Sequence, residues 1–295
     1  MSAKKSNGIG VGVFQIIADL FTGDPAVVAR RAEALGFDSY WLPEHAAIPR
    51  GSEDVYPGKV EGGAVPDYLF KMPDPFIALS RAAATTSTIL LGTAVALVPE
   101  RHPVLTAKEI ASLDHYSKGR FLYGIGAGWN EPECTMMGGD FAHRWTQVKE
   151  YIAAMKGLWT GEYFGTSGRY ANFPPSVCRP TPWRKPHPPI LLGSIGSPKV
   201  YRRVAQWGDG WLPFVVNPQE VRDGRVELNR HAKECGRDPK SINITAFAPD
   251  GMFRRKSDLR TLADAGADNV VLWLQGQSEA AILQEMETLA AEIFD

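Results

Sequence analysis

The stretch from residue 89 to residue 131 constrains the fold of this chain more than any other. It begins with a short apolar run that shows no alternation with polar residues, which is typical of a parallel strand covered on both faces. Pro103 suits the first position of a helix, and apolar residues recur after it at helical spacing. A second apolar run, residues 121–125, leads into Gly-Ala-Gly. The stretch therefore predicts a strand–helix–strand unit with a small-residue loop where such folds bind ligands.

The same succession of short apolar strands and helices runs along the whole chain. Several helices are predicted to begin with a capping side chain followed by proline, a pairing that suits a helix start: Asp24-Pro25, Asp74-Pro75, Ser197-Pro198 and Asn217-Pro218. About eight strand–helix units without an obvious linker predict one α/β domain, residues 1–295, folded as a (β/α)8 TIM barrel. A doubly wound open sheet is the alternative. Two long segments, at about 46–71 and 161–187, are expected to be lid-like insertions over the carboxyl ends of the strands.

Composition excludes several classes of function. The 295 residues carry a net charge of −1, so no strong field attracts nucleic acid or an anionic membrane. No apolar run reaches transmembrane length, and no signal-peptide core is visible at the start. The three cysteines are widely spaced, which predicts neither a disulfide framework nor a metal site and fits the cytoplasm.

In a barrel, the residues that follow the strands form the active site. The candidates are those that end or follow the predicted strands: Gln15, Glu44, His45, Thr93, Ala94, Val95, Gly126, Ala127, Gly128, Trp129, Asn130, Gly193, Ser194, Ile195, Gly196, Ser197 and Trp273.

Four segments in this order resemble the bacterial luciferase-like family of flavin and deazaflavin oxidoreductases. They are AEALGFDSYWLPEH, the long segment from DPFIALSRAAATTSTILLGTAV to GIGAGWNEPE, GRYANFPPSVCRPTPWRKPHPPILLGS, and RRVAQWGDGWLP. Within that family the chain is most similar to the branch that depends on coenzyme F420, a 5-deazaflavin. The resemblance implies a (β/α)8 barrel, a homodimer, and cofactor contacts from the strand-end residues above.

The resemblance also implies particular roles. Ala94 and Val95 match a bulge that carries a non-proline cis peptide and presses on one face of the deazaflavin. Residues 126–128 lie beside the cofactor, and Asn130 is a hydrogen-bonding partner. The sugar-phosphate dehydrogenase branch has an acidic catalytic residue where this chain has Trp129. That departure argues against oxidation of glucose 6-phosphate and favours an apolar substrate wall.

Two groups of residues are candidates for catalysis and for phosphate binding. Glu44 and His45 follow a strand together, and a histidine that titrates near neutrality suits acid–base work beside a hydride-transfer centre. The alternative is a solvated loop histidine in a salt bridge. Residues 193–199 offer backbone N–H groups at a helix start together with Lys199, which predicts a phosphate site. An ordinary capped turn is the alternative there.

The leading hypothesis is an F420-dependent oxidoreductase that transfers a hydride between the deazaflavin and a small organic substrate. Glu44 and His45 are the predicted catalytic residues. Trp129, Tyr68, Trp183 and Trp273 are predicted to line the substrate pocket. An FMN-dependent monooxygenase of the same family is the alternative, and a barrel that binds a ligand without turnover is a third possibility.

Overall fold

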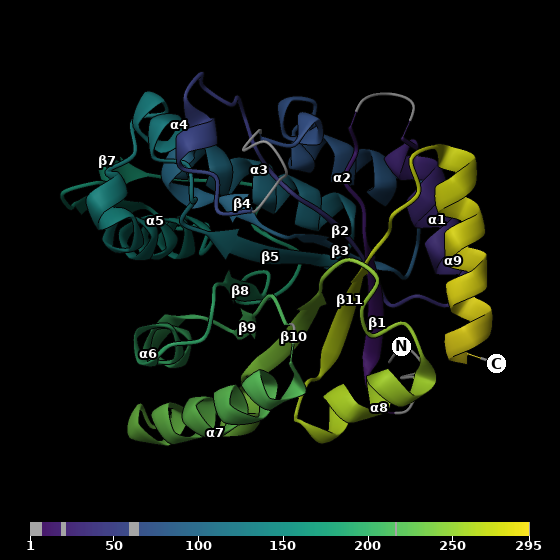
Figure 1. The fold of residues 1–295 in the computed structure, drawn as a ribbon. Helices are drawn as coiled ribbons and strands as arrows, with labels where there is room; N and C mark the ends of the chain where they lie inside the picture. Colours follow the sequence, from purple (N-terminus) through teal and green to yellow (C-terminus); the bar gives the residue numbers. More distant parts are fainter. Residues whose placement is uncertain (1–7, 19–21, 59–64, 216, 295) are drawn as a thin grey trace.

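Eight parallel strands close into a barrel in the computed structural model, which describes residues 8–18, 22–58, 65–215 and 217–294 (Figure 1). Around the barrel the order is β1, β2, β3, β5, β8, β9, β10 and β11, and β11 pairs with β1. Pairing of Leu91 with Phe121 joins β3 to β5 and closes the ring. The predicted TIM barrel is therefore confirmed, and the open sheet is excluded because the ring has no free edge.

The strands are short, as expected for a small barrel. They are β1 (Gly10–Phe14), β2 (Ser39–Leu42), β3 (Leu90–Thr93), β4 (Ala96–Leu97), β5 (Phe121–Gly126), β6 (Phe164–Ser167), β7 (Asn172–Ser176), β8 (Ile190–Gly193), β9 (Gly210–Leu212), β10 (Asn243–Ala248) and β11 (Asn269–Trp273). β4 continues along β5 beyond β3, after an interruption at residues 94–95.

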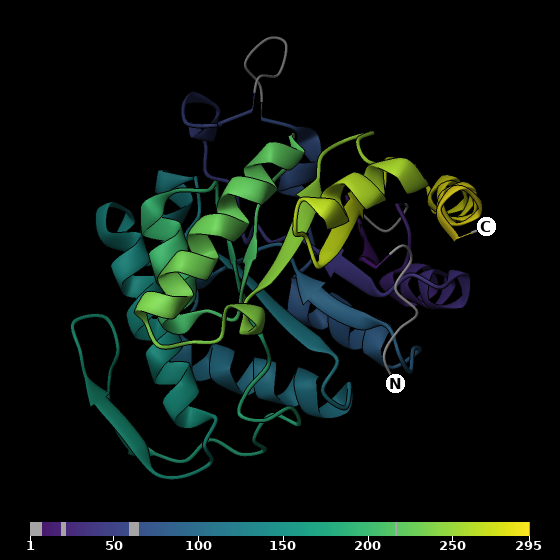
Figure 2. The ribbon, with the colours of Figure 1, turned by 90° about the horizontal axis from the view of Figure 1, so that it is seen from below.

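Helices surround the strands, as Figure 2 shows from below. They are α1 (Pro25–Leu35), α2 (Pro75–Ala83), α3 (Pro103–Tyr116), α4 (Glu131–Met136), α5 (Arg144–Leu158), α6 (Pro198–Trp207), α7 (Pro218–Glu234), α8 (Lys256–Asp264) and α9 (Glu279–Phe294). The short 3-10 helices are η1 (Ser52–Asp54), η2 (Asp67–Phe70), η3 (Val98–Glu100), η4 (Phe141–His143) and η5 (Pro239–Ser241). Within the described residues, none of the helices combines the length and the hydropathy needed to cross a bilayer.

The capping pattern read from the sequence determines where four of the helices begin. The side chains of Asp24, Asp74, Ser197 and Asn217 each accept a hydrogen bond from a backbone N–H in the first turn of α1, α2, α6 and α7. In each case the next residue is the predicted proline, whose missing N–H costs nothing at a helix start. All four predicted helix starts are confirmed.

Two layers of apolar side chains stabilise the barrel. Side chains that point outward from the strands form the larger core together with the helices. Side chains that point inward fill the barrel itself: Phe14, Trp41, Leu191, Leu212, Phe247 and Val271. Because the interior is packed, chemistry is confined to the ends of the barrel.

The two insertions differ in position. The segment at residues 46–71 contains η1 and η2, and its residues 59–64 lie outside the described residues. The segment at residues 161–187 contains an antiparallel hairpin of β6 and β7, which confirms its hairpin-like pattern. Glu150 of α5 accepts hydrogen bonds of 2.7 Å from the backbone N–H groups of Tyr170 and Ala171, so the hairpin lies along the outside of α5 (Figures 1 and 2). The prediction that this segment covers the strand ends is therefore wrong.

Trp183, at the end of the same segment, is also displaced from its predicted place. Its ring contacts His115, near the end of α3, with centroids 5.7 Å apart. It also lies against Gly119, two residues before β5 begins. These contacts place Trp183 at the amino-terminal end of the strands, so it does not line a pocket at the carboxyl end.

Candidate active site

His45 is held at the carboxyl end of β2 by groups from a distant part of the chain. Its Nδ1 lies 2.7 Å from Oε2 of Glu133 in α4, and its Nε2 lies 3.2 Å from the indole Nε1 of Trp129. Because an indole only donates, Nε2 accepts this hydrogen bond and Nδ1 carries the ring proton that points to Glu133. The result is a basic nitrogen at the strand end, supported by a carboxylate.

Glu133 also organises the backbone that follows His45. Its Oε1 accepts hydrogen bonds from the N–H groups of Ala46, at 3.0 Å, and Ala47, at 3.3 Å. The residue is fully buried, so these contacts satisfy a carboxylate that water does not reach. Sequence reasoning missed Glu133. The available signal was Asn130 followed three residues later by Glu, the spacing of a capped helix start, which α4 confirms.

Glu44, the other predicted catalytic residue, is directed elsewhere. Its Oε2 accepts from the N–H of Leu97 at 2.7 Å, and its Oε1 accepts from Nε of Arg101 at 2.6 Å. Burial raises the pKa of Glu44, and the Arg101 guanidinium opposes that rise. The predicted pairing of Glu44 with His45 is corrected: the carboxylate that contacts His45 is Glu133, because successive residues of an extended chain point in opposite directions. Glu44 instead ties the end of β2 to β4.

Glu100 is a third buried carboxyl group near this site. Among the described residues, neither of its oxygens has a hydrogen-bond partner, and the residue is 4% exposed. Burial and the nearby Glu133 and Glu44 raise the pKa of Glu100 to about 9, against the opposing effect of Arg101. Glu100 is therefore a neutral acid at pH 7. It lines a cavity of about 310 Å³ together with residues that include Glu44, Asp74 and Arg101.

The interruption between β3 and β4 places Val95 between two glycines. The Ala94–Val95 peptide is cis, as the resemblance implied. A Cβ added to Gly126 would lie 2.6 Å from Cγ2 of Val95, and one added to Gly193 would lie 2.4 Å from its Cγ1. The small residues that end β5 and β8 therefore make room for the Val95 side chain.

Three residues predicted to contact a cofactor use their side chains within the protein. Gln15 donates to the carbonyl of Thr22 at 2.9 Å and accepts from the hydroxyl of Tyr40 at 2.5 Å. Thr93 donates its hydroxyl to the carbonyl of Gly124 at 2.7 Å. Asn130 caps α4 and donates to the Ser52 hydroxyl at 2.9 Å. The side chains of all three are buried, so they shape the site from behind.

The predicted phosphate loop leads from β8 into α6. The indole of Trp211 donates to the carbonyl of Ser194 at 2.9 Å, which fixes the start of the loop. Ile195 is 82% exposed at its tip, and Ser197 caps the helix. Lys199 is exposed in the first turn and has no partner among the described residues. The loop thus presents helix-start N–H groups and a lysine to solvent, which suits an anion.

Aromatic rings gather where β1, β10 and β11 end. The ring of Phe14 lies 4.7 Å from that of Phe247 and 5.8 Å from that of Trp273, measured between centroids. Phe214 stacks on Phe247 and is 50% exposed. Tyr68 of the first insertion lies 6.5 Å from Trp273. Two residues of the predicted substrate pocket, Tyr68 and Trp273, are therefore close together, whereas Trp129 lies beside His45.

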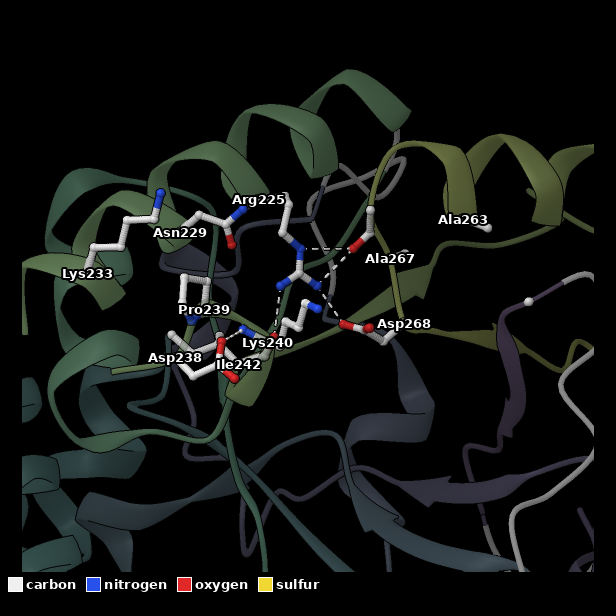
Figure 3. Close-up of a pocket in the computed structure, with 12 residues that line it drawn as sticks. Arg225, Asn229, Lys233, Asp238, Pro239, Lys240, Ile242, Ala263, Ala267 and Asp268 are labelled. Carbon is white, nitrogen blue, oxygen red and sulfur yellow. Dashed lines mark hydrogen bonds and ion pairs between the residues drawn. The ribbon is translucent and has the colours of Figure 1, made fainter. Parts of the chain in front are cut away.

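A larger pocket, of about 640 Å³, lies at the opposite end of the barrel (Figure 3). Its central side chain, Arg225, donates to the carbonyls of Gly266 and Ile242 and pairs with Asp268. These bonds fasten α7 to the segments just before β10 and β11. Residues at the amino-terminal face of a TIM barrel mainly stabilise the fold, and the hydrogen bonds and ion pair of Arg225 are consistent with that role.

Comparison with known sequences identifies the family. The sequence profile of the luciferase-like monooxygenases matches residues 25–287. The chain belongs to this family. It is 39% identical over 283 residues to an uncharacterised protein of Mycobacterium tuberculosis, an alignment that covers 93% of this chain and 96% of the relative.

Solved structures of this fold include enzymes with two kinds of cofactor. One is an F420-dependent secondary alcohol dehydrogenase in complex with an F420–acetone adduct (TM-score 0.74, 16% identity, 99% of this chain and 100% of that one). Another is the oxygenating constituent of 3,6-diketocamphane monooxygenase from the CAM plasmid of Pseudomonas putida, in complex with FMN (TM-score 0.73, 16% identity, 97% of this chain and 98% of that one). At these identities the likeness shows the fold, and both cofactors occur within it.

Proposed function

We propose that this protein is an F420-dependent oxidoreductase that transfers a hydride between the deazaflavin and a small organic substrate. The observation that carries the proposal is the pairing of His45 with buried Glu133 at the carboxyl end of β2. Interconversion of an alcohol and a carbonyl moves a proton as well as a hydride, so the site needs a group that exchanges protons near neutral pH. His45 lies at the end of the barrel where this fold carries out chemistry, with Nδ1 on Glu133 and Nε2 on the side of Trp129.

The residues around the strand ends fit a flat, anionic cofactor. Val95, set between Gly126 and Gly193, offers an apolar surface for a ring system. The loop of residues 193–197 and Lys199 would hold a phosphate group with N–H donors and a cation. When bound, the deazaflavin supplies the carbon that accepts or donates the hydride.

In this proposal the protein side chains transfer the proton that accompanies the hydride. In the oxidation direction Nε2 of His45 accepts the proton of the substrate, and in the reverse direction it returns that proton. Glu133 stabilises the imidazolium because its Oε2 lies 2.7 Å from Nδ1. Tyr68, Trp129 and Trp273 exclude water from the reacting groups in this proposal.

An FMN-dependent monooxygenase is the second candidate, since an enzyme of the same fold binds FMN. The same apolar surface beside Val95 and the same helix start would serve a flavin phosphate. A barrel that binds a ligand without turnover is the third candidate.

Titration of the purified protein with F420 and with FMN, followed by cofactor fluorescence, separates these candidates. We expect F420 to bind and FMN to bind at least tenfold more weakly. The reverse order would support the monooxygenase. Binding of F420 with no change in its absorbance across a broad panel of alcohols and carbonyl compounds would leave the non-catalytic barrel.

A further inference from the structure

Trp129 differs from the tryptophans of the hydrophobic core. Trp41, Trp159 and Trp211 are no more than 1% exposed and lie in the hydrophobic core. Trp129 is only half-buried and belongs to neither hydrophobic cluster of the described residues. It follows Gly128, whose φ of +79° turns the chain sharply after β5.

Two aromatic rings contact this indole in the part of the chain that the structure describes. Its Nε1 donates to Nε2 of His45, and its ring meets the edge of His45, with centroids 5.4 Å apart. On another side it meets the ring of Tyr56, at 5.3 Å. Burial and the neighbouring Tyr56 raise the pKa of Tyr68, so the two tyrosines of the first insertion lie near each other beside this indole.

His45, in contrast, is firmly held. Glu133 is fully buried and binds both the ring of His45 and the N–H groups of the next two residues. If the contact between His45 and Trp129 breaks, Trp129 is therefore the side chain that moves.

We infer that Trp129 is a gate over His45. In the closed state the indole N–H of Trp129 donates to Nε2 of His45. A substrate can contact that nitrogen only when the Trp129 side chain turns away. Tyr56 holds the gate closed, which links the position of Tyr56 to the availability of His45. Trp129 is thus a positioning residue that acts through His45. The importance of the gate for catalysis rests on the proposed function, whereas its existence does not.

Acylation with diethyl pyrocarbonate tests the gate without any substrate, because this reagent attacks an unprotonated imidazole nitrogen. The rate at His45 is followed by peptide mass spectrometry at pH 7, and the other histidines serve as internal references: His102, His115, His143, His187 and His231. Trp129→Phe keeps an aromatic ring and removes the donor. We expect His45 to react about three- to tenfold faster in this variant, the usual effect of losing one neutral hydrogen bond.

Two further variants make the result specific. Tyr56→Ala removes the ring that supports Trp129 and is expected to speed acylation of His45 in the same way. Trp183→Phe changes a tryptophan at the opposite end of the barrel and is expected to leave the rate unchanged. Circular dichroism confirms that each variant is folded.

Equal rates at His45 in wild type, Trp129→Phe and Tyr56→Ala would overturn the inference. A faster rate at every histidine would also overturn it, since general loosening would explain it. If the gate is found but the protein does not bind F420, the proposed function fails and the gate stands.

Discussion

The Nδ1 atom of His45 lies 2.7 Å from Oε2 of Glu133, although 88 positions separate the two residues in the chain. The contact joins the end of β2 to the short helix that follows β5. Because Glu133 also accepts the N–H groups of Ala46 and Ala47, one buried carboxylate fixes both the ring and the backbone after it. A histidine held in this way keeps one tautomer and one orientation, which acid–base catalysis requires.

His45→Asn tests the catalytic role. Asparagine keeps polarity and approximate size but does not titrate near neutral pH. We expect F420 binding to persist while turnover falls by roughly 10²–10⁴-fold, the usual effect of losing a general acid–base group. The loss falls mainly on kcat, because the proton moves in the transition state. Steady-state kinetics across pH measures this, with His115→Asn at the opposite end of the barrel as the matched control.

A variant with normal turnover and weak F420 binding would contradict this role. His45 would then position the cofactor ring, and the acid would have to be another group near the strand ends.

Much of the fold was predictable because its signals are local. The capped prolines mark helix starts through contacts within one turn, and the apolar strands are short and continuous. The partner of His45 was not predictable from spacing, since Glu133 reaches it only after the barrel closes. The alternation of side chains along the extended chain explains why Glu44, adjacent in sequence, bonds Arg101 instead.

The glycines at the strand ends show a second limit of sequence reasoning. Their small size predicted close approach by a ligand, yet Gly126 and Gly193 make room for Val95. A glycine in the sequence shows that a side chain is missing at that position, but it does not show whether a ligand or another residue occupies the space. The same limit applies to residues 161–187, whose turn-rich composition fits a surface hairpin as well as a lid.

Gly193→Ala tests the packing of Val95. The added methyl group would lie 2.4 Å from Cγ1 of Val95, so one of them must move. We expect a loss of about 1–3 kcal/mol in the free energy of unfolding, the usual cost of overpacking. Chemical denaturation measures it, and the double variant with Val95→Ala should recover part of the loss through a favourable coupling energy. Additive effects in the double variant would mean that the methyl group is accommodated elsewhere.

Lys199→Glu tests the proposed phosphate site. Lys199 is exposed and has no partner among the described residues, so its replacement should leave the fold intact. We expect F420 affinity to fall at least tenfold, about 1.4 kcal/mol, and the loss to shrink at high salt. Fluorescence titration measures this, with Lys149→Glu, an equal change of charge at an exposed residue of α5, as the control. The variant Gly196→Asp would test the same site less cleanly. A Cβ at residue 196 would lie 2.2 Å from the Tyr201 hydroxyl, so the substitution would also disturb local packing. Unchanged affinity in Lys199→Glu would show that Lys199 does not contact the phosphate.

Glu100→Gln tests the neutral buried acid. Burial, Glu133 and Glu44 raise the pKa of Glu100 from 4.5 to about 9, and Arg101 offsets only part of that rise. Between these two values the folded protein binds one proton more than the unfolded chain, so the free energy of unfolding falls as pH rises. The contribution is fully present below pH 4.5, is lost as pH rises towards 9, and has a slope of at most about 1.4 kcal/mol per pH unit.

Glutamine removes that dependence because it carries no titrating proton. Urea unfolding of both proteins from pH 5 to pH 9 should therefore show a stability difference that moves steadily in favour of Glu100→Gln as pH increases. The pH dependence is the decisive quantity, since the amide also loses or gains hydrogen bonds that are independent of pH. A difference that stays constant over this range would mean that Glu100 is ionised in the folded protein, with its charge balanced by Arg101.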